Sequence, residues 1–215
     1  MVAGIKFIKQ RLEEKTQLDI LEQEKANAEI KLLKAQINPR ILSKTLYQLH
    51  QLTLDKSDEA PEVVVKLSEM LDYMLYQCNE PKVLVSNEIP LIQNYLDLEK
   101  LRHQPNLSIR FYHEFANSTT TITPLLILTL VESLISKVST NLATNANFEV
   151  FLIEENNQLK CTILSNVILE NIPLDQHVKK QLDLLYPNQY ELKTNQENGA
   201  YKLQLALHLN PVNPE

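Results

Sequence analysis

Glycine is almost missing from this chain, and its shortage limits what the chain can build. The 215 residues include two glycines, Gly4 and Gly199, where average usage of about 7% would supply roughly fifteen. The sequence between them contains none. A loop that brings backbone amides against phosphates usually needs glycine, because a side chain would block the approach. The sequence therefore offers no obvious material for a glycine-rich phosphate-binding loop.

The first 37 residues have the pattern of a long helix. Residues 5–37 contain neither glycine nor proline and are rich in charge. The apolar positions at coiled-coil a and d spacing, interrupted by Lys25, are Leu18, Leu21, Ala28, Leu32 and Ala35. We expect a coiled coil that is kinked or restarted at Asn38-Pro39, since proline removes a donor and restricts the residue before it.

Two more helices are predicted before residue 80. An apolar helical face continues from Pro39 to about Leu54, residues 55–61 form a turn, and a second apolar stripe follows over residues 64–78. These segments predict an antiparallel hairpin. A hairpin with a wide apolar stripe tends to pair with another, so we expect a parallel homodimer with a four-helix bundle.

The pattern changes after Pro81 to alternating strands and helices. Period-two alternation and turn residues predict strands near residues 83–85, 107–115, 119–123, 148–154, 159–165, 190–195 and 201–209. Helices are predicted at residues 87–103 with Ser86 as N-cap, at 124–137 and at 174–186. We expect an α+β chain in two domains, with helical residues 1–80 followed by a two-layer α/β sandwich, residues 81–215, whose helices cover one face of a mixed sheet.

Charge and cysteine content restrict the partners and the compartment. A formal net charge of −6 provides no basic surface for nucleic acid. The two cysteines, Cys78 and Cys161, lie in apolar patterns, which indicates reduced, packed thiols of a cytoplasmic protein. No apolar run reaches the roughly 18 residues that span a bilayer, so any membrane attachment would come from segments absent from this chain.

Four segments resemble the LytS-type sensor histidine kinases, and they occur in that family's order. They are LKAQINP at 33–39, EAPEVVVKLSEMLDYMLY at 59–76, YLDLEKLR at 95–102 and LLYPNQYELK at 184–193. The likeness covers about residues 25–210. It implies a bacterial two-component protein whose hairpin dimerises and transfers phosphate. It also implies a sandwich of the GHKL, or Bergerat, ATPase type, which binds ATP and Mg²⁺ in the family.

The residue that accepts phosphate in the family is changed in this sequence. The family motif runs Gln-Ile-Asn-Pro-His-Phe-Leu-Phe-Asn, and its histidine corresponds to Arg40. A neutral imidazole has a nucleophilic nitrogen near pH 7, whereas a guanidinium is charged and has no free lone pair. His50 is no obvious substitute, because ten residues of α-helix place it roughly 80° from the face of position 40.

The family's nucleotide site is altered as well. Its Pro-Leu-Val-Glu-Asn-Ala helix corresponds to residues 129–134, where Glu132 is retained and Ser133 replaces the asparagine that holds Mg²⁺. Two glycines of the family's phosphate loop correspond to Ile172 and Leu174, with Pro173 between them. The degenerate positions of the ATP site are Ser133, Val138, Asn166, Val167, Ile172 and Leu174. We therefore expect no catalytic residue, no bound nucleotide and no metal.

These changes favour a histidine-kinase-like pseudokinase that acts by dimerisation and protein contacts. The alternative is an active sensor histidine kinase or a response-regulator phosphatase with an atypical nucleotide site; an adaptor outside the phosphorelay is a third reading. Expected partners are a second copy and either a response regulator or an active histidine kinase. The expected location is the cytoplasm, as a free protein or as the cytosolic part of an inner-membrane sensor.

A last expectation concerns the segment that folds over ATP in the family. Here residues 167–174 read VILENIPL and are mostly apolar. Burying such side chains is favourable by roughly 1.5 to 3 kcal/mol each. We therefore expect the segment to collapse onto the helix that carries Leu130, Leu134 and Val138 and to fill the former nucleotide cleft.

Overall fold

The computed structural model describes residues 39–78, 80–115, 119–140, 145–155, 157–167, 176–197 and 200–209, with the isolated positions 11 and 15. The chain divides into two compact units, Met1–Ile37 and Asn38–Glu215, and the elements discussed below belong to the second. The coiled coil expected over residues 5–37 lies outside the described residues. Within the described part of the chain, no helix is long and apolar enough to cross a membrane.

The predicted helical hairpin is present. Helix α2 runs Pro39–Leu54 and helix α3 runs Ala60–Asp72, which continues into a short π-helix, η1, at Tyr73–Gln77. Proline suits the first turn of α2, because an N–H there would have no intrahelical partner. The turn between the helices places Lys56 at a φ of 52°.

A small two-stranded sheet leads from the hairpin into the second half. Strand β1 (Val83–Leu84) pairs antiparallel with β3 (Thr121–Ile122), and helix α4 (Val85–His103) follows β1 directly. The prediction that Ser86 caps this helix is wrong. The helix begins at Val85, whose amide donates to the Thr120 carbonyl over 2.9 Å. A neighbouring backbone segment thus satisfies the amide.

The main sheet has five strands in the order β2-β4-β5-β7-β6. The strands are β2 (Leu107–Glu114), β4 (Ala146–Glu155), β5 (Gln158–Ser165), β6 (Tyr190–Glu197) and β7 (Ala200–His208). Only β2 and β4 run parallel among these pairs; the other three neighbours are antiparallel. The α+β class and the mixed sheet are confirmed.

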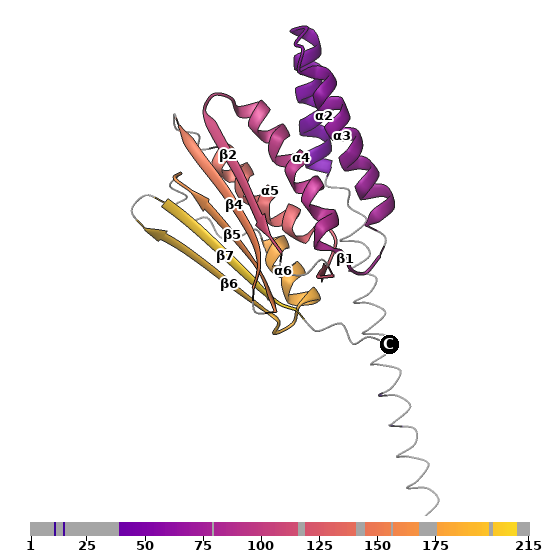
Figure 1. The fold of residues 1–215 in the computed structure, drawn as a ribbon, viewed down its shortest axis with the longest axis vertical. Helices are drawn as coiled ribbons and strands as arrows, with labels where there is room; N and C mark the ends of the chain where they lie inside the picture. Colours follow the sequence, from indigo (N-terminus) through magenta and orange to yellow (C-terminus); the bar gives the residue numbers. More distant parts are fainter. Residues whose placement is uncertain are drawn as a thin grey trace, which may run out of the picture. The chain divides into compact units, whose positions relative to one another are not determined.

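Helices cover one face of this sheet. Helix α5 (Leu126–Thr140) packs against β4 and β5, with α4 and α6 (Gln176–Leu185) beside it (Figure 1). The inward-facing residues of β4, Phe148, Val150 and Leu152, are fully buried, as the alternating pattern predicts. Helix α5 begins two residues after Pro124, later than expected, because Leu125 has a φ of 63° and cannot belong to the helix.

The hairpin packs against α4, through α3 (Figure 1). Three polar pairs join this helical run to α4 in antiparallel order: Lys66 with Asp97 at 2.8 Å, Glu69 with Asn94 at 2.8 Å, and Tyr73 with Glu88 at 2.7 Å. Beside these pairs α3 buries Val63, Leu67 and Met70. Part of the apolar stripe that predicted dimerisation is therefore covered within one chain.

Candidate functional site

Arg40, at the family's phosphoacceptor position, lies in the first turn of α2. The residues that follow it on one face, Ile41 and Thr45, are 4% and 1% exposed, and the Thr45 hydroxyl donates to the Ile41 carbonyl over 2.9 Å. His50 is exposed farther along the same helix. The start of α2 is thus anchored in the core directly after the substituted position.

A buried carboxylate on α4 faces the next turn of α2. Glu99 is 1% exposed, accepts a hydrogen bond from Arg102, and has His103 Nε2 at 3.4 Å. Burial alone would raise the pKa of Glu99, but the His103 hydrogen bond and the charges of Arg102 and Lys44 hold that pKa below its ordinary value. Lys44 belongs to α2, where the family motif has asparagine. A cation on the hairpin therefore stabilises an anion on α4.

Glu132 and Ser133, which the resemblance aligns with the family's metal-binding helix, lie in the middle of α5 and are 6% and 4% exposed. The Ser133 hydroxyl donates to the Leu130 carbonyl of its own helix over 2.9 Å. Tyr95 of α4 is buried beside two carboxylates. Burial first, and then the charges of Glu99 and Glu132, raise the pKa of its hydroxyl well above the ordinary value. The charges of Glu132 and Glu99 thus act on the same buried hydroxyl.

The other degenerate positions that are described are built into the fold. Val138, at a family glycine, is fully buried on α5, and Val167 is 6% exposed in the same core. The Asn166 side chain accepts from the Asn147 amide at 2.7 Å and donates to the Asn145 carbonyl at 3.0 Å. Asn166 therefore fastens the end of β5 to the start of β4.

Ile172 and Leu174 lie outside the described residues, as does most of the segment expected to fill the cleft. That closure stays a prediction, although Val167 at its first position is buried. Within the described ranges, no group of three or more His, Cys, Asp or Glu side chains could hold a metal ion.

The sequence reasoning missed two groups of polar residues. Glu99 lies inside the YLDLEKLR segment, but nothing in that segment marked it as a buried carboxylate. Glu88 is 0% exposed and accepts hydrogen bonds from Tyr73 and from the Leu125 amide. One sequence signal could have indicated that both glutamates are buried. Glu88 and Glu99 share one side of α4 with the apolar Ile92 and Tyr95, at helical spacing.

A helical hairpin with a Pro39 start, followed by a mixed-sheet α+β domain, matches the arrangement that the motifs of the sequence imply. The model of the histidine kinase family matches residues 28–107. Over these residues the chain is similar to the histidine kinases, and its motifs and the relatives described next are similar to those of the LytS type.

Two curated relatives are LytS proteins of staphylococci. The sensor protein LytS of Staphylococcus haemolyticus is 23% identical over 185 residues, which cover 85% of this chain and 32% of that protein. The sensor histidine kinase/phosphatase LytS of Staphylococcus aureus is 27% identical over 129 residues, which cover 60% of this chain and 22% of that protein. The chain thus spans about a third or less of the length of these relatives.

Solved structures of histidine kinases also match part of the chain. The histidine kinase domain of a blue-light activated kinase from Erythrobacter litoralis is 11% identical, with a TM-score of 0.47. The match covers 78% of this chain and 96% of that chain.

Proposed function

We propose that this chain is a two-component signalling protein of the LytS type that has lost histidine kinase catalysis. It acts as a pseudokinase, through dimerisation and through contacts with other proteins. ATP and Mg²⁺, which the family uses, are not expected ligands of this chain.

The observation that carries this proposal is the use of the former site residues as structural parts of the domain. Ser133 stands where the family holds its metal, and its hydroxyl bonds to its own helix at 2.9 Å. The Val138 side chain occupies a fully buried position where the family has glycine. Replacing Ser133 by asparagine or Val138 by glycine would alter the core. Neither change would supply a phosphoacceptor, because position 40 is arginine.

One observation favours the alternative, an active kinase or response-regulator phosphatase with an atypical nucleotide site. Glu132 is retained, and its charge, like that of Glu99, raises the pKa of the Tyr95 hydroxyl. In an active protein, the retained Glu132 would be the acidic residue that acts on a nucleotide or a phosphorylated partner. The two proposals differ in whether Mg-ATP binds.

The test is thermal unfolding with and without Mg-ATP, combined with incubation in radiolabelled ATP. A ligand that binds only the folded state raises the unfolding temperature by mass action. We expect no rise and no acid-labile label, in the wild type and in Arg40→His alike, with an active LytS protein as positive control. Label on the wild-type chain would overturn the pseudokinase proposal and support the alternative.

The hairpin is the proposed dimerisation surface. Seven large apolar side chains of the hairpin are exposed by 47% or more: Leu46, Tyr47, Leu54, Val64, Val65, Leu75 and Tyr76. We infer an interaction site from this concentration of exposed apolar side chains, because large exposed apolar patches are uncommon on soluble monomers. A second hairpin offers the same stripe and would complete a four-helix bundle.

Light scattering at micromolar concentration tests the dimer. We expect twice the chain mass for the wild type and a single chain mass after Tyr47→Ser with Tyr76→Ser. Tyr112→Ser is the matched control, because Tyr112 is 47% exposed but belongs to strand β2. A wild-type monomer would count against dimerisation through the hairpin.

The proposed partners are a response regulator or an active histidine kinase of the same signalling system. The compartment proposed is the cytoplasm, where the chain would act as a free protein or as the cytosolic part of an inner-membrane sensor. We propose neither nucleic acid nor a metal as a ligand.

A further inference from the structure

Two separate sets of polar contacts converge on three consecutive residues, Thr123, Pro124 and Leu125. These residues form the turn between β3 and α5. Each set begins on the hairpin side of the molecule, at η1 or at the segment that links the hairpin to the sandwich. The two sets are described in turn.

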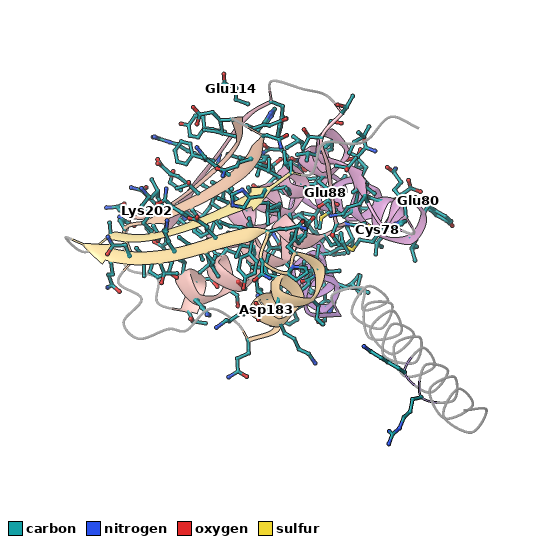
Figure 2. The ribbon with its side chains drawn as sticks, turned by 90° about the horizontal axis from the view of Figure 1, so that it is seen from below. Cys78, Glu80, Glu88, Glu114, Asp183 and Lys202 are labelled. Atoms are coloured by element: carbon teal, nitrogen blue, oxygen red, sulfur yellow. The ribbon has the colours of Figure 1, made fainter. Side chains whose placement is uncertain are left out.

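The first set runs from η1 through α4 to the turn. The Tyr73 hydroxyl donates to Glu88 Oε1 at 2.7 Å. The Leu125 amide donates to the same carboxylate, at 3.0 Å to Oε1 and 3.1 Å to Oε2. Glu88 is 0% exposed, and Figure 2 shows it inside the helical layer, whereas Asp183 lies on the outer side of α6. A buried carboxylate that lost either donor would be left under-satisfied, so both contacts are expected to persist.

The second set runs from the linker through the end of α6 to the same turn. Lys82 Nζ donates to the Tyr186 hydroxyl at 2.8 Å and lies 4.0 Å from the centre of its ring. The Thr123 amide donates to the same hydroxyl oxygen at 2.9 Å, and the Thr123 hydroxyl lies 3.2 Å from it. Tyr186 follows α6 directly and is 3% exposed.

The turn has little freedom to adjust to one set without disturbing the other. Leu125 has a φ of 63°, a left-handed conformation that a leucine adopts only where its surroundings hold it. Its carbonyl accepts from both the amide of Thr129 at 2.9 Å and the hydroxyl of that residue at 2.7 Å. Thr123 is 1% exposed. We therefore expect a displacement of Leu125 to move Thr123, two residues earlier in the chain, and also the first turn of α5.

We propose that the turn at residues 123–125 mechanically couples the hairpin to α6, so that a shift of η1 changes how firmly the end of α6 is held. Glu88 and Tyr186 are the positioning residues of this device. In a protein without catalysis, such a connection is a route by which a signal reaching the hairpin changes a distant helix of the sandwich. The inference goes beyond the proposed function and does not depend on whether the chain binds ATP.

A double-mutant cycle on the full chain tests the coupling. Tyr73→Phe removes the donor to Glu88, and Tyr186→Phe removes the oxygen that receives Lys82 and Thr123. Independent contacts have multiplicative effects on the unfolding equilibrium constant, whereas coupled ones do not. We expect the double variant to depart from the product of the single effects by about threefold or more. Tyr73→Phe with Tyr112→Phe, whose second site is on the exposed side of β2, is the control and should be multiplicative.

Amide hydrogen exchange is a second measurement. If Tyr73 had only a local role, its replacement would leave the exchange rates in α6 unchanged. None of the described hydrogen bonds joins Tyr73 to α6, yet we expect Tyr73→Phe to speed amide exchange within Gln176–Leu185. Lys82→Met, at an exposed residue where misfolding is not expected, should speed exchange in the same helix and at Leu125. Multiplicative unfolding constants, or exchange changes confined to the mutated element and its direct contacts, would overturn the proposal.

Discussion

The hairpin and the sandwich differ in how completely they cover their apolar side chains. Nine large apolar residues are exposed in the described part of the chain, and Leu84 and Tyr112 are the two that lie outside the hairpin. In the sandwich, α5 is buried on nearly every side, from Leu126 to Val138. Helix α3 buries one side against α4 and leaves Val64 and Val65 exposed on the other.

The sandwich and the hairpin belong to one compact unit but differ in what covers their apolar side chains. The sandwich covers its own apolar core, with α5 buried along most of its length. The hairpin buries only the apolar side chains on the side that packs against α4. We propose that a second molecule covers the remainder, because exposed apolar stripes on soluble proteins are usually interaction sites.

The largest expected effect would come from a cavity in the sandwich. Phe148 on β4 is 0% exposed. Phe148→Ala should lower the free energy of unfolding by about 3 to 5 kcal/mol, because burial is lost and the surrounding structure only partly relaxes into the space. Chemical denaturation followed by circular dichroism would measure this loss.

Tyr47→Ala is the counterpart of that variant on the hairpin. Tyr47 is 68% exposed, so at low concentration the change should stay within about 0.5 kcal/mol. If a second chain covers Tyr47, the loss of stability caused by Tyr47→Ala should grow as protein concentration rises, since association stabilises the wild type by mass action. A loss equal to that of Phe148→Ala in dilute solution would show that the hairpin surface is already packed in the monomer.

An intermediate effect is expected at Glu88, where the hairpin and the sandwich meet. Burial, opposed by the Leu125 amide and the Tyr73 hydroxyl, raises the pKa of Glu88 from 4.5 to about 6. The folded state therefore holds this proton to higher pH than the unfolded state. The resulting stabilisation is fully present below pH 4.5 and is lost as pH rises through 6, by about 2 kcal/mol.

Glu88→Gln would remove this titration. The free energy of unfolding of the variant, minus that of the wild type, should increase by about 2 kcal/mol between pH 4.5 and pH 7. Tyr73, whose pKa is raised by burial and by the Glu88 charge, stays neutral in this range. Denaturation curves at several pH values measure the difference. If this difference in the free energy of unfolding does not change with pH, Glu88 ionises in the folded protein as readily as in the unfolded chain.

The parts of the fold that follow from local pattern were predictable from sequence. Strand β4 alternates buried and outward residues from Ala146 onward, and the helix that begins at Leu126 is rich in apolar residues, so each element has a clear pattern. The start of α4 was not predictable, because the Val85 amide is satisfied by Thr120, which is distant in sequence. The π-helix at residues 73–77 has no sequence signal of its own.

The candidate site positions came only from the family motif, and they stay a prediction. Arg40, Glu132 and Ser133 were found by matching residues, and the structure places the last two in the core. The buried polar contacts were missed for a physical reason. A charged residue such as Glu88 or Glu99 normally indicates surface, and whether it is buried depends on partners many residues away that no periodicity reveals.

The smallest expected effect concerns the ion pair between the hairpin and the sandwich. Lys66 Nζ lies 2.8 Å from Asp97 Oδ2, and the two side chains are 17% and 33% exposed. Asp97 also accepts from Gln93 at 2.8 Å, and Lys66 has Glu62 at 3.6 Å, so each partner keeps another contact when one is removed. A double-mutant cycle with Lys66→Met and Asp97→Asn should give a coupling of about 0.5 kcal/mol at low salt.

The pair of Lys160 and Glu155 is the control within the sandwich. Its atoms are 2.9 Å apart, but its side chains are 41% and 60% exposed, so its coupling should be nearer to zero. Raising ionic strength from about 0.1 M to 1 M shortens the screening length from about 10 Å to 3 Å and should reduce the Lys66–Asp97 coupling less than that of the exposed pair. Equal couplings with equal salt dependence would show that the contact between α3 and α4 is as open to solvent as the outer surface. In that case the hairpin would be held to the sandwich by its apolar residues and by Glu88 rather than by this pair.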